Sequence, residues 1–189
     1  MGDAGMIKRL IENLARAKRL EDERGAALVE MAICLPLMLV LVFGLIDFSQ
    51  MIYDKQTMSG ISRQGSNLAS RSFTGSSTSL PTVVSSLVTQ GTSLNIGTNG
   101  RIIVTVVADV NNKPQIIDQA ISQTGISATS TVGTGIGNAA TMPSDATTVL
   151  SAGRTLYVTE VFYSYTPMTP VGGFLKKSLA SRMYDVAYF

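Results

Sequence analysis

An apolar segment near the N-terminus constrains this chain more than any other feature. It runs from Ala26 to Ile46, 21 residues among which Glu30 carries the only charge. A bilayer core roughly 30 Å thick is crossed by about 20 helical residues, so the segment predicts a transmembrane helix. A carboxylate in hydrocarbon costs about 2.5–3.5 kcal/mol on insertion scales, so we expect Glu30 to have a partner.

The charges on either side of the segment predict its orientation. Six Lys and Arg residues precede it, whereas Lys55 is the first that follows it. The positive-inside rule therefore places the N-terminal part in the cytoplasm and the C-terminus outside. An ordinary secretory signal is excluded, because the apolar segment is longer than about 7–15 residues and no Ala-x-Ala site follows it. The basic N-terminal part fits either an amphipathic helix on the inner leaflet or a disordered tail.

Gly25 precedes the apolar segment directly, at a fixed distance from its one charge. If the chain is cut after Gly25, Ala26 gains an α-amino group and Glu30 becomes the fifth residue. The amine and the carboxylate could then pair between neighbouring subunits that are displaced along a common axis. Pro36 removes one hydrogen bond within the helix, so we expect a kink or a locally melted turn there.

These residues resemble the class III signal of type IV pilins and pseudopilins, in which a basic leader, a Gly, four residues and a Glu precede a retained apolar helix. The closer resemblance is to the TadE/TadF-like minor pilins of tight-adherence (Tad, Flp-type) pili. Met31 stands where that family usually has an aromatic residue. The motifs that carry the resemblance are Gly25-Ala26-Ala27-Leu28-Val29-Glu30-Met31-Ala32, Leu35-Pro36-Leu37, Phe43-Gly44-Leu45-Ile46-Asp47-Phe48 and, near the C-terminus, Glu160-Val161-Phe162-Tyr163-Ser164-Tyr165-Thr166-Pro167.

The resemblance implies a minor pilin that a prepilin peptidase cleaves between Gly25 and Ala26. It further implies insertion in the bacterial inner membrane and a role in starting or capping a pilus used for adhesion. The implied partners are this peptidase, other minor and major pilins, the inner-membrane assembly platform and membrane lipid. The alternative is an uncleaved, permanently anchored periplasmic binding or adhesion module. Glu30 separates the two, because a plain anchor gains nothing from a carboxylate at this spacing.

Composition limits the chemistry that the chain can perform. Histidine is absent, and Cys34, the single cysteine, lies within the apolar segment. Nucleophile–His catalysis, Cys/His metal sites and an internal disulfide are therefore excluded. A net charge of +2 implies no nucleic-acid surface. The exported carboxylates are scattered, so we expect no enzyme activity, no catalytic residues, no metal and no cofactor.

The helix should continue beyond the membrane, because Met51, Met58, Ile61, Gly65 and Leu68 form a narrow apolar stripe at helical spacing. The stripe could face a sheet of the same chain or a neighbouring helix. We therefore expect an α+β fold in which a long N-terminal transmembrane helix packs on an antiparallel sheet of about four strands. The expected parts are a leader (1–25), a transmembrane helix (26–46), its exported continuation (47–71), a linker with a short helix (72–100) and a β-sheet domain (101–189).

Within the exported part, β-branched and aromatic residues predict the strands. Pro81 and Gly91 bound a short helix, and 94–100 is expected to be loop. A Gly/Ser/Thr-rich segment at 124–152 is expected to be surface loop; its glycines lack the Lys and the strand-to-helix context of a phosphate loop. The expected strands are 101–110, 115–122 after a turn at 111–114 (helix being the competing prediction for 115–122), 154–165 and 178–189.

Overall fold

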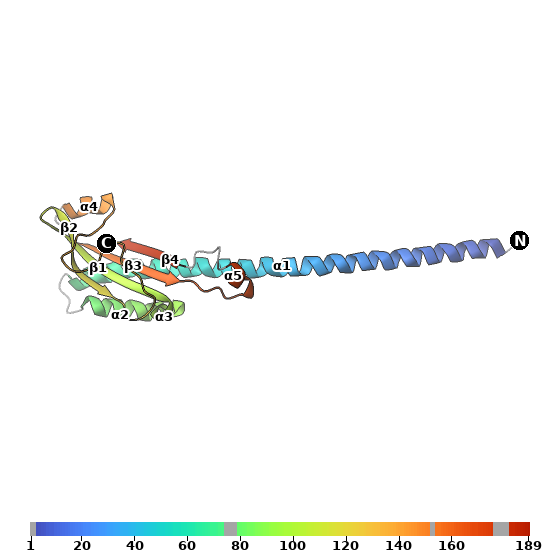
Figure 1. The fold of residues 1–189 in the computed structure, drawn as a ribbon, viewed down its shortest axis with the longest axis horizontal. Helices are drawn as coiled ribbons and strands as arrows, with labels where there is room; N and C mark the ends of the chain where they lie inside the picture. The colour runs from blue at the N-terminus through green and yellow to red at the C-terminus, as the bar shows by residue number, and fades with distance from the viewer. Residues whose placement is uncertain (1–2, 74–78, 152–153, 176–181) are drawn as a thin grey trace. The chain divides into compact units, whose positions relative to one another are not determined.

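The computed structural model describes residues 3–73, 79–151, 154–175 and 182–189. The chain divides into two compact units, Met1–Ile46 and Asp47–Phe189, which we describe separately. The first unit consists of the N-terminal part of helix α1 (Asp3–Phe73), and the second contains the remainder of α1 and the sheet (Figure 1).

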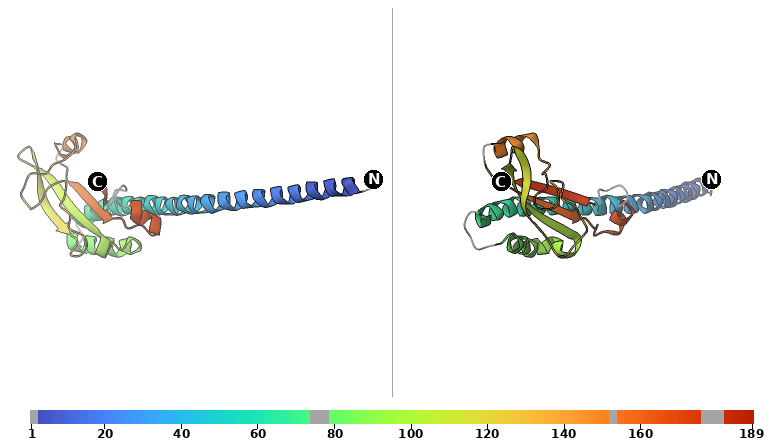
Figure 2. Two further views of the ribbon diagram at one scale, coloured as in Figure 1. Left: turned by 45° about the vertical axis from the view of Figure 1, so that its right-hand side comes forward. Right: turned by 60° about the vertical axis from the view of Figure 1, so that its left-hand side comes forward.

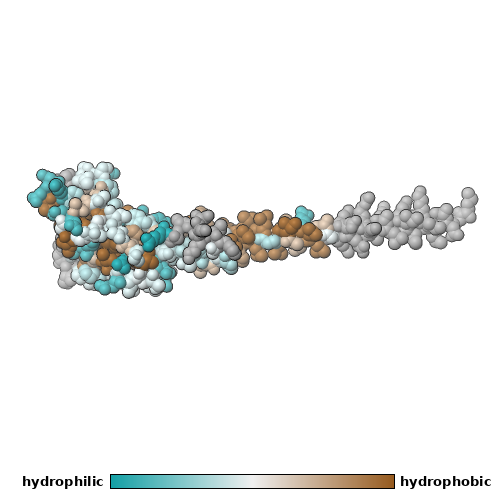
Figure 3. Space-filling view, in the orientation of Figure 1, coloured by the Kyte–Doolittle hydropathy of each residue, from teal (hydrophilic) through white to brown (hydrophobic). Residues whose placement is uncertain are grey.

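The described side chains of the first unit are almost all exposed. Leu28 is 68 % exposed and Leu45 67 %, and the band of apolar residues is visible in Figure 3. Among the described residues, one helix is long and apolar enough to cross a membrane, and this segment belongs to it. Because apolar side chains this exposed are unfavourable in water, the helix is compatible with a single-pass membrane anchor.

The second unit is built on a four-stranded antiparallel sheet with the strand order β2-β1-β3-β4. Its strands are β1 (Gly100–Val110), β2 (Lys113–Ile121), β3 (Leu156–Ser164) and β4 (Arg182–Tyr188). The turn between β1 and β2 is Asn111-Asn112, with φ of 56° and 60°. Asparagine tolerates this left-handed conformation, which two-residue hairpin turns require. The prediction of a strand after this turn is confirmed, although Lys113 and Pro114 already belong to β2.

One face of the sheet is covered by α1 and by α2 (Leu80–Gln90), as the two views of Figure 2 show. Met58 and Ile61 of the predicted stripe are buried there against residues such as Ile102 and Val161. A Cβ added at Gly65 would lie 2.6 Å from Thr159 Cγ2, so glycine lets the helix approach the sheet. The stripe therefore faces the sheet of its own chain, and the predicted α+β fold is confirmed.

The other face of the sheet carries a second apolar cluster, which includes Val107, Val158 and Leu156. The segment expected to be surface loop covers it, because Val132 and Leu150 are buried in this cluster. Leu150 lies on α4 (Ser144–Ser151), a helix that the sequence analysis missed. The prediction of an aperiodic surface loop over 124–152 is thus wrong for these parts.

One further prediction of irregular structure needs correction. Residues 94–100 hold the end of the 3-10 helix η1 (Gly91–Leu94), the helix α3 (Ile96–Asn99) and the first residue of β1. The helix α5 (Pro170–Leu175) follows the Pro-containing turn after β3. Ile96 is fully buried, so burial in the core compensates for the weak helix signal of such short segments. Residues 178–181 of the last predicted strand lie outside the described residues.

Candidate functional site

The predicted processing site lies on the exposed part of α1. Gly25, Ala26 and Glu30 are exposed, and a Cβ added at Gly25 would meet nothing within 4 Å. The Gly25–Ala26 peptide bond lies inside the helix, so a peptidase must open the helix locally to reach it. Glycine within a helix costs about 1 kcal/mol relative to alanine, which makes this the easier place to open.

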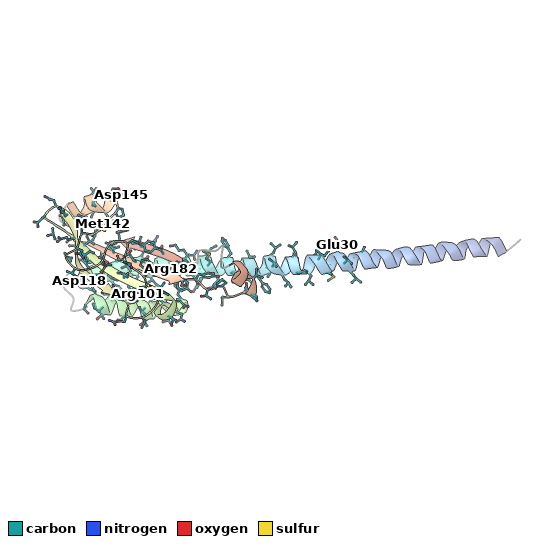
Figure 4. All side chains as sticks on the ribbon, in the orientation of Figure 1. Glu30, Arg101, Asp118, Met142, Asp145 and Arg182 are labelled. Carbon is teal, nitrogen blue, oxygen red and sulfur yellow. The ribbon has the colours of Figure 1, made fainter. Side chains whose placement is uncertain are left out.

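Glu30 projects from α1 in Figure 4. None of the hydrogen bonds or ion pairs between side chains that the structure describes involves Glu30. Its pairing with the amine of Ala26 on another subunit stays a prediction. The helix continues through Pro36 without interruption, so a melted turn is not present; the kink stays a prediction.

Asp47, from the Gly-Leu-Ile-Asp-Phe motif, joins the first turn of the second unit to the segment after β3. Its carboxylate accepts hydrogen bonds from the backbone N–H groups of Met168 (3.0 Å) and Thr169 (3.1 Å) and from the Thr169 hydroxyl. The Tyr165 hydroxyl donates to the Asp47 carbonyl oxygen at 2.9 Å. Asp47 is only 3 % exposed, and a Cβ added at Gly172 would lie 2.2 Å from its Oδ2. The motif therefore fastens α1 to the C-terminal Tyr-x-Pro turn.

Asp54 forms a second contact of the same kind. It is 3 % exposed, accepts a hydrogen bond from Gln50 Nε2 at 2.8 Å and is hydrogen-bonded to the hydroxyl of Tyr163. Asp47 and Asp54 are seven residues apart, nearly two helical turns, and so share a face of α1. Tyr163 and Tyr165 are two residues apart on an extended chain and likewise share a face. Two Asp–Tyr pairs therefore set the position of α1 along β3.

Polar side chains of α1 also contact the edge strand β4. The ammonium group of Lys55 lies 2.7 Å from Asp185 Oδ1 and donates to the Tyr184 carbonyl oxygen. The Ser62 hydroxyl donates to Asp185 Oδ2 at 2.6 Å, and the Ser66 hydroxyl donates to the Ala187 carbonyl oxygen at 2.8 Å. These bonds hold α1 against the strand, and the Lys55 ammonium group satisfies the Tyr184 carbonyl group, which a bare edge would leave for another chain.

Glu160, the first residue of the C-terminal motif, is fully buried on the opposite face. Its carboxylate accepts hydrogen bonds from the Ser130 hydroxyl, from Thr131 (N–H at 2.8 Å and hydroxyl at 2.6 Å) and from the Tyr184 hydroxyl at 3.0 Å. Because these donors surround it, the carboxylate holds the loop at Ser130 and Thr131 to the sheet. Sequence reasoning had grouped Glu160 with scattered carboxylates.

The four carboxylates described above are engaged in structural hydrogen bonds. No group of three or more His, Cys, Asp or Glu side chains suited to a metal ion occurs in the described part of the chain. The arrangement therefore fastens a helix to a sheet. Asp47 and Asp54 were not among the predicted site residues. The sequence signal that could have identified them is a pair of acidic residues seven positions apart, nearly two helical turns, on the face of α1 that packs on the sheet.

The Asp54–Tyr163 pair predicts a change in stability at alkaline pH. Burial, together with the nearby charge of Asp54, raises the pKa of Tyr163 to about 12. The unfolded chain then loses this proton at a lower pH than the folded one, so the contribution of Tyr163 to stability is full below pH 10 and is lost towards pH 12. We expect Tyr163→Phe to lower the free energy of unfolding by about 1–3 kcal/mol at pH 7, because the buried Asp54 loses a hydrogen-bond donor. At pH 11.5 the substitution should lower the free energy of unfolding by less.

Urea unfolding of a soluble fragment comprising residues 47–189 at pH 7, 10 and 11.5 measures this effect. Tyr53→Phe is the matched control, because Tyr53 lies on the same helix, next to Asp54, and is 56 % exposed. A penalty for Tyr163→Phe that stays constant over this range would contradict the assigned pairing.

An exposed apolar helical segment that continues into an α+β domain is typical of a protein anchored by a single helix. The family model described as TadE-like protein matches residues 25–67. The resemblance to the TadE-like proteins of Tad pilus systems is therefore confirmed, over the part of the chain that runs from Gly25 into the part of α1 that packs on the sheet. No curated protein and no solved structure matches the chain.

Proposed function

We propose that this chain is a minor pilin or pseudopilin of a Tad-type type IV pilus. The main support for the proposal is the range of the TadE-like match. The match begins at Gly25 and does not include the basic residues that precede it. The matched part thus consists of the last residue of the proposed leader followed by the helix that would remain after cleavage. Glu30 falls within it, at the fifth position of the proposed mature chain.

On this proposal the chain has a class III signal peptide and is inserted once in the bacterial inner membrane. Its N-terminus is cytoplasmic and its C-terminus periplasmic. The prepilin peptidase removes the leader, and the assembly platform passes the mature protein into a fibre with other minor and major pilins. The chain acts there without enzymatic activity, at initiation or at the tip, in pilus biogenesis and adhesion. The exposed apolar side chains of Leu28, Met31 and Leu35 support this, because lipid and then neighbouring helices would cover them.

One observation favours the uncleaved anchor as a second candidate. The Gly25–Ala26 bond lies within a continuous helix, and a helical bond resists proteolysis until it opens. The two candidates differ in the mature N-terminus, which can be measured directly.

We expect the protein recovered from membranes of cells with an active prepilin peptidase to begin at Ala26. Gly25→Val should leave the leader attached, because a β-branched side chain keeps the peptidase away from the peptide bond. Gly44→Val is the matched control, since both glycines lie on α1 and a Cβ added at either would meet nothing within 4 Å. Intact-mass analysis of the wild type and both variants tests this; a wild type that keeps its leader would favour the uncleaved anchor.

A further inference from the structure

An apolar groove lies in the second unit between the beginning of its part of α1 and β4. It has a volume of about 440 Å³. Phe48 and Ile52 in its wall are 58 % and 45 % exposed, whereas Met183 is buried beneath. The lining residues that matter here are Phe48, Ile52, Lys55, Arg182, Met183 and Tyr184.

Two basic residues lie at the edge of this apolar groove. Lys55 and Arg182 both line the groove, and both are exposed. Lys55 already contacts Asp185 and the Tyr184 carbonyl oxygen, and Arg182 Nη2 donates to the Ser127 carbonyl oxygen at 3.2 Å. Asp185 offsets the charge of Lys55, and none of the ion pairs in the described part of the chain involves Arg182, so one net positive charge lies next to an apolar cleft. Such a site suits a molecule with a hydrocarbon part and an anionic head.

The groove is also close in the chain to the apolar segment of the first unit. Phe48 and Ile52 come two and six residues after Ile46, a rise of about 3 and 9 Å along a helix. The headgroup layer of a bilayer is about 5–8 Å thick on each side of the core. The groove therefore begins, at Phe48, within the depth of the headgroup layer, where a phospholipid can reach it.

We propose that this groove binds one anionic phospholipid of the membrane that α1 enters. An acyl chain lies against Phe48, Ile52 and Met183, and the phosphate group contacts Lys55 and Arg182. The inference rests on the membrane anchoring in the proposed function, but it needs neither cleavage nor assembly. The bound lipid would cover apolar surface of the exported domain while the protein waits in the membrane.

Photo-cross-linking of the full-length protein in nanodiscs tests the proposal. The nanodiscs contain phosphatidylethanolamine and phosphatidylglycerol, and benzoylphenylalanine replaces Ile52. We expect a mass adduct of one intact phospholipid, at least five-fold more abundant than with the probe at Ser49 or Ile136. Ser49 is exposed, lies on α1 nearer to Ile46 and does not line the groove; Ile136 is an exposed residue far from it in the chain. Arg182→Gln should lower the share of phosphatidylglycerol in the adduct.

Three results would overturn the proposal. Equal lipid adducts at Ser49 and Ile52 would mean that nearness to the bilayer, and not the groove, places the lipid. A cross-link from position 52 to a second copy of the chain would make the groove a protein contact. No adduct above that at Ile136 would leave the groove without lipid. Gly25→Val serves as a parallel arm: its leader stays attached, so an adduct there separates lipid binding from processing and pilus function.

Discussion

Replacing Glu30 with alanine should abolish assembly into pili while membrane insertion and removal of the leader continue. Loss of a charge eases entry into the bilayer, so insertion should not suffer. In the proposed fibre, however, the amine of Ala26 on a neighbouring subunit would lose its partner in a low-dielectric environment. Breaking a buried ion pair from one side costs about 3–5 kcal/mol, which is enough to prevent a weak subunit contact. Glu30→Gln should fail in the same way, because the amide keeps the shape and removes the charge.

Pilus counts by electron microscopy, with immunoblots for processing, measure this effect in cells whose only copy is the variant. Cys34→Ala is the matched control: Cys34 lies about one helical turn after Glu30 on the same exposed helix, and its truncation leaves the charge in place. Normal numbers of pili with Glu30→Ala would remove the pairing hypothesis. The uncleaved anchor would then be the better account of the apolar helix.

Ile61→Asp should unfold or severely destabilise the second unit, Asp47–Phe189. Ile61 is 2 % exposed and belongs to the core between α1 and the sheet. Burying an unpaired carboxylate there costs several kcal/mol, a large part of the about 5–15 kcal/mol that stabilises a typical domain. Leu68→Asp should cost less, because Leu68 is only half-buried at the edge of this core.

Thermal melts of the fragment 47–189 compare the melting temperatures of these variants with that of the wild type. The fragment must begin at Asp47, because this residue fastens α1 to the turn after β3. Gly60→Asp is the matched control: it places the same carboxylate one residue away, on an exposed face where a Cβ meets nothing within 4 Å. If Ile61→Asp and Gly60→Asp melted alike, the apolar stripe would have to face another subunit.

The sequence predicted the parts of the fold that depend on a regular period. The strand expected at 154–165 is present, and its alternation places Tyr157 and Val161 in one apolar cluster and Leu156 and Val158 in the other. The stripe on α1 was also predicted. By itself it left the partner open, because a stripe shows that a helix packs and not what it packs against; the sheet was expected as the partner because its apolar face needs a cover.

The short helices were not predicted, because their stability comes from contacts with residues that are distant in the sequence. The α3 segment has four residues, two of them Gly97 and Asn99, and gives no periodic signal. It is helical because Ile96 fills the core. α4 lies in a Ser/Thr-rich stretch, where only Ala146 and Leu150, one turn apart, indicate a buried side. Patterns in so few residues cannot outweigh local propensity.

The contacts of Asp47 could not be predicted for a different reason. An acidic residue at the end of an apolar segment is commonly a charge placed in the aqueous interface. Its actual partners, Met168 and Thr169, are more than 120 residues away in the chain. The sequence nevertheless held a signal, because the motifs that carried the family resemblance lie at both ends of the chain. The structure brings Asp47 from one motif to Tyr165 of the other.

Mass spectrometry of purified pili tests the central claim most directly. Pili sheared from cells that express the wild-type protein should contain this chain at low abundance, with an N-terminal peptide that begins at Ala26. Deletion of the prepilin peptidase should remove the chain from the sheared fraction and leave it in the membrane with its leader attached. A chain that stays in the membrane with residues 1–25 intact, and is absent from pili of cells with an active peptidase, would contradict the proposed minor-pilin function.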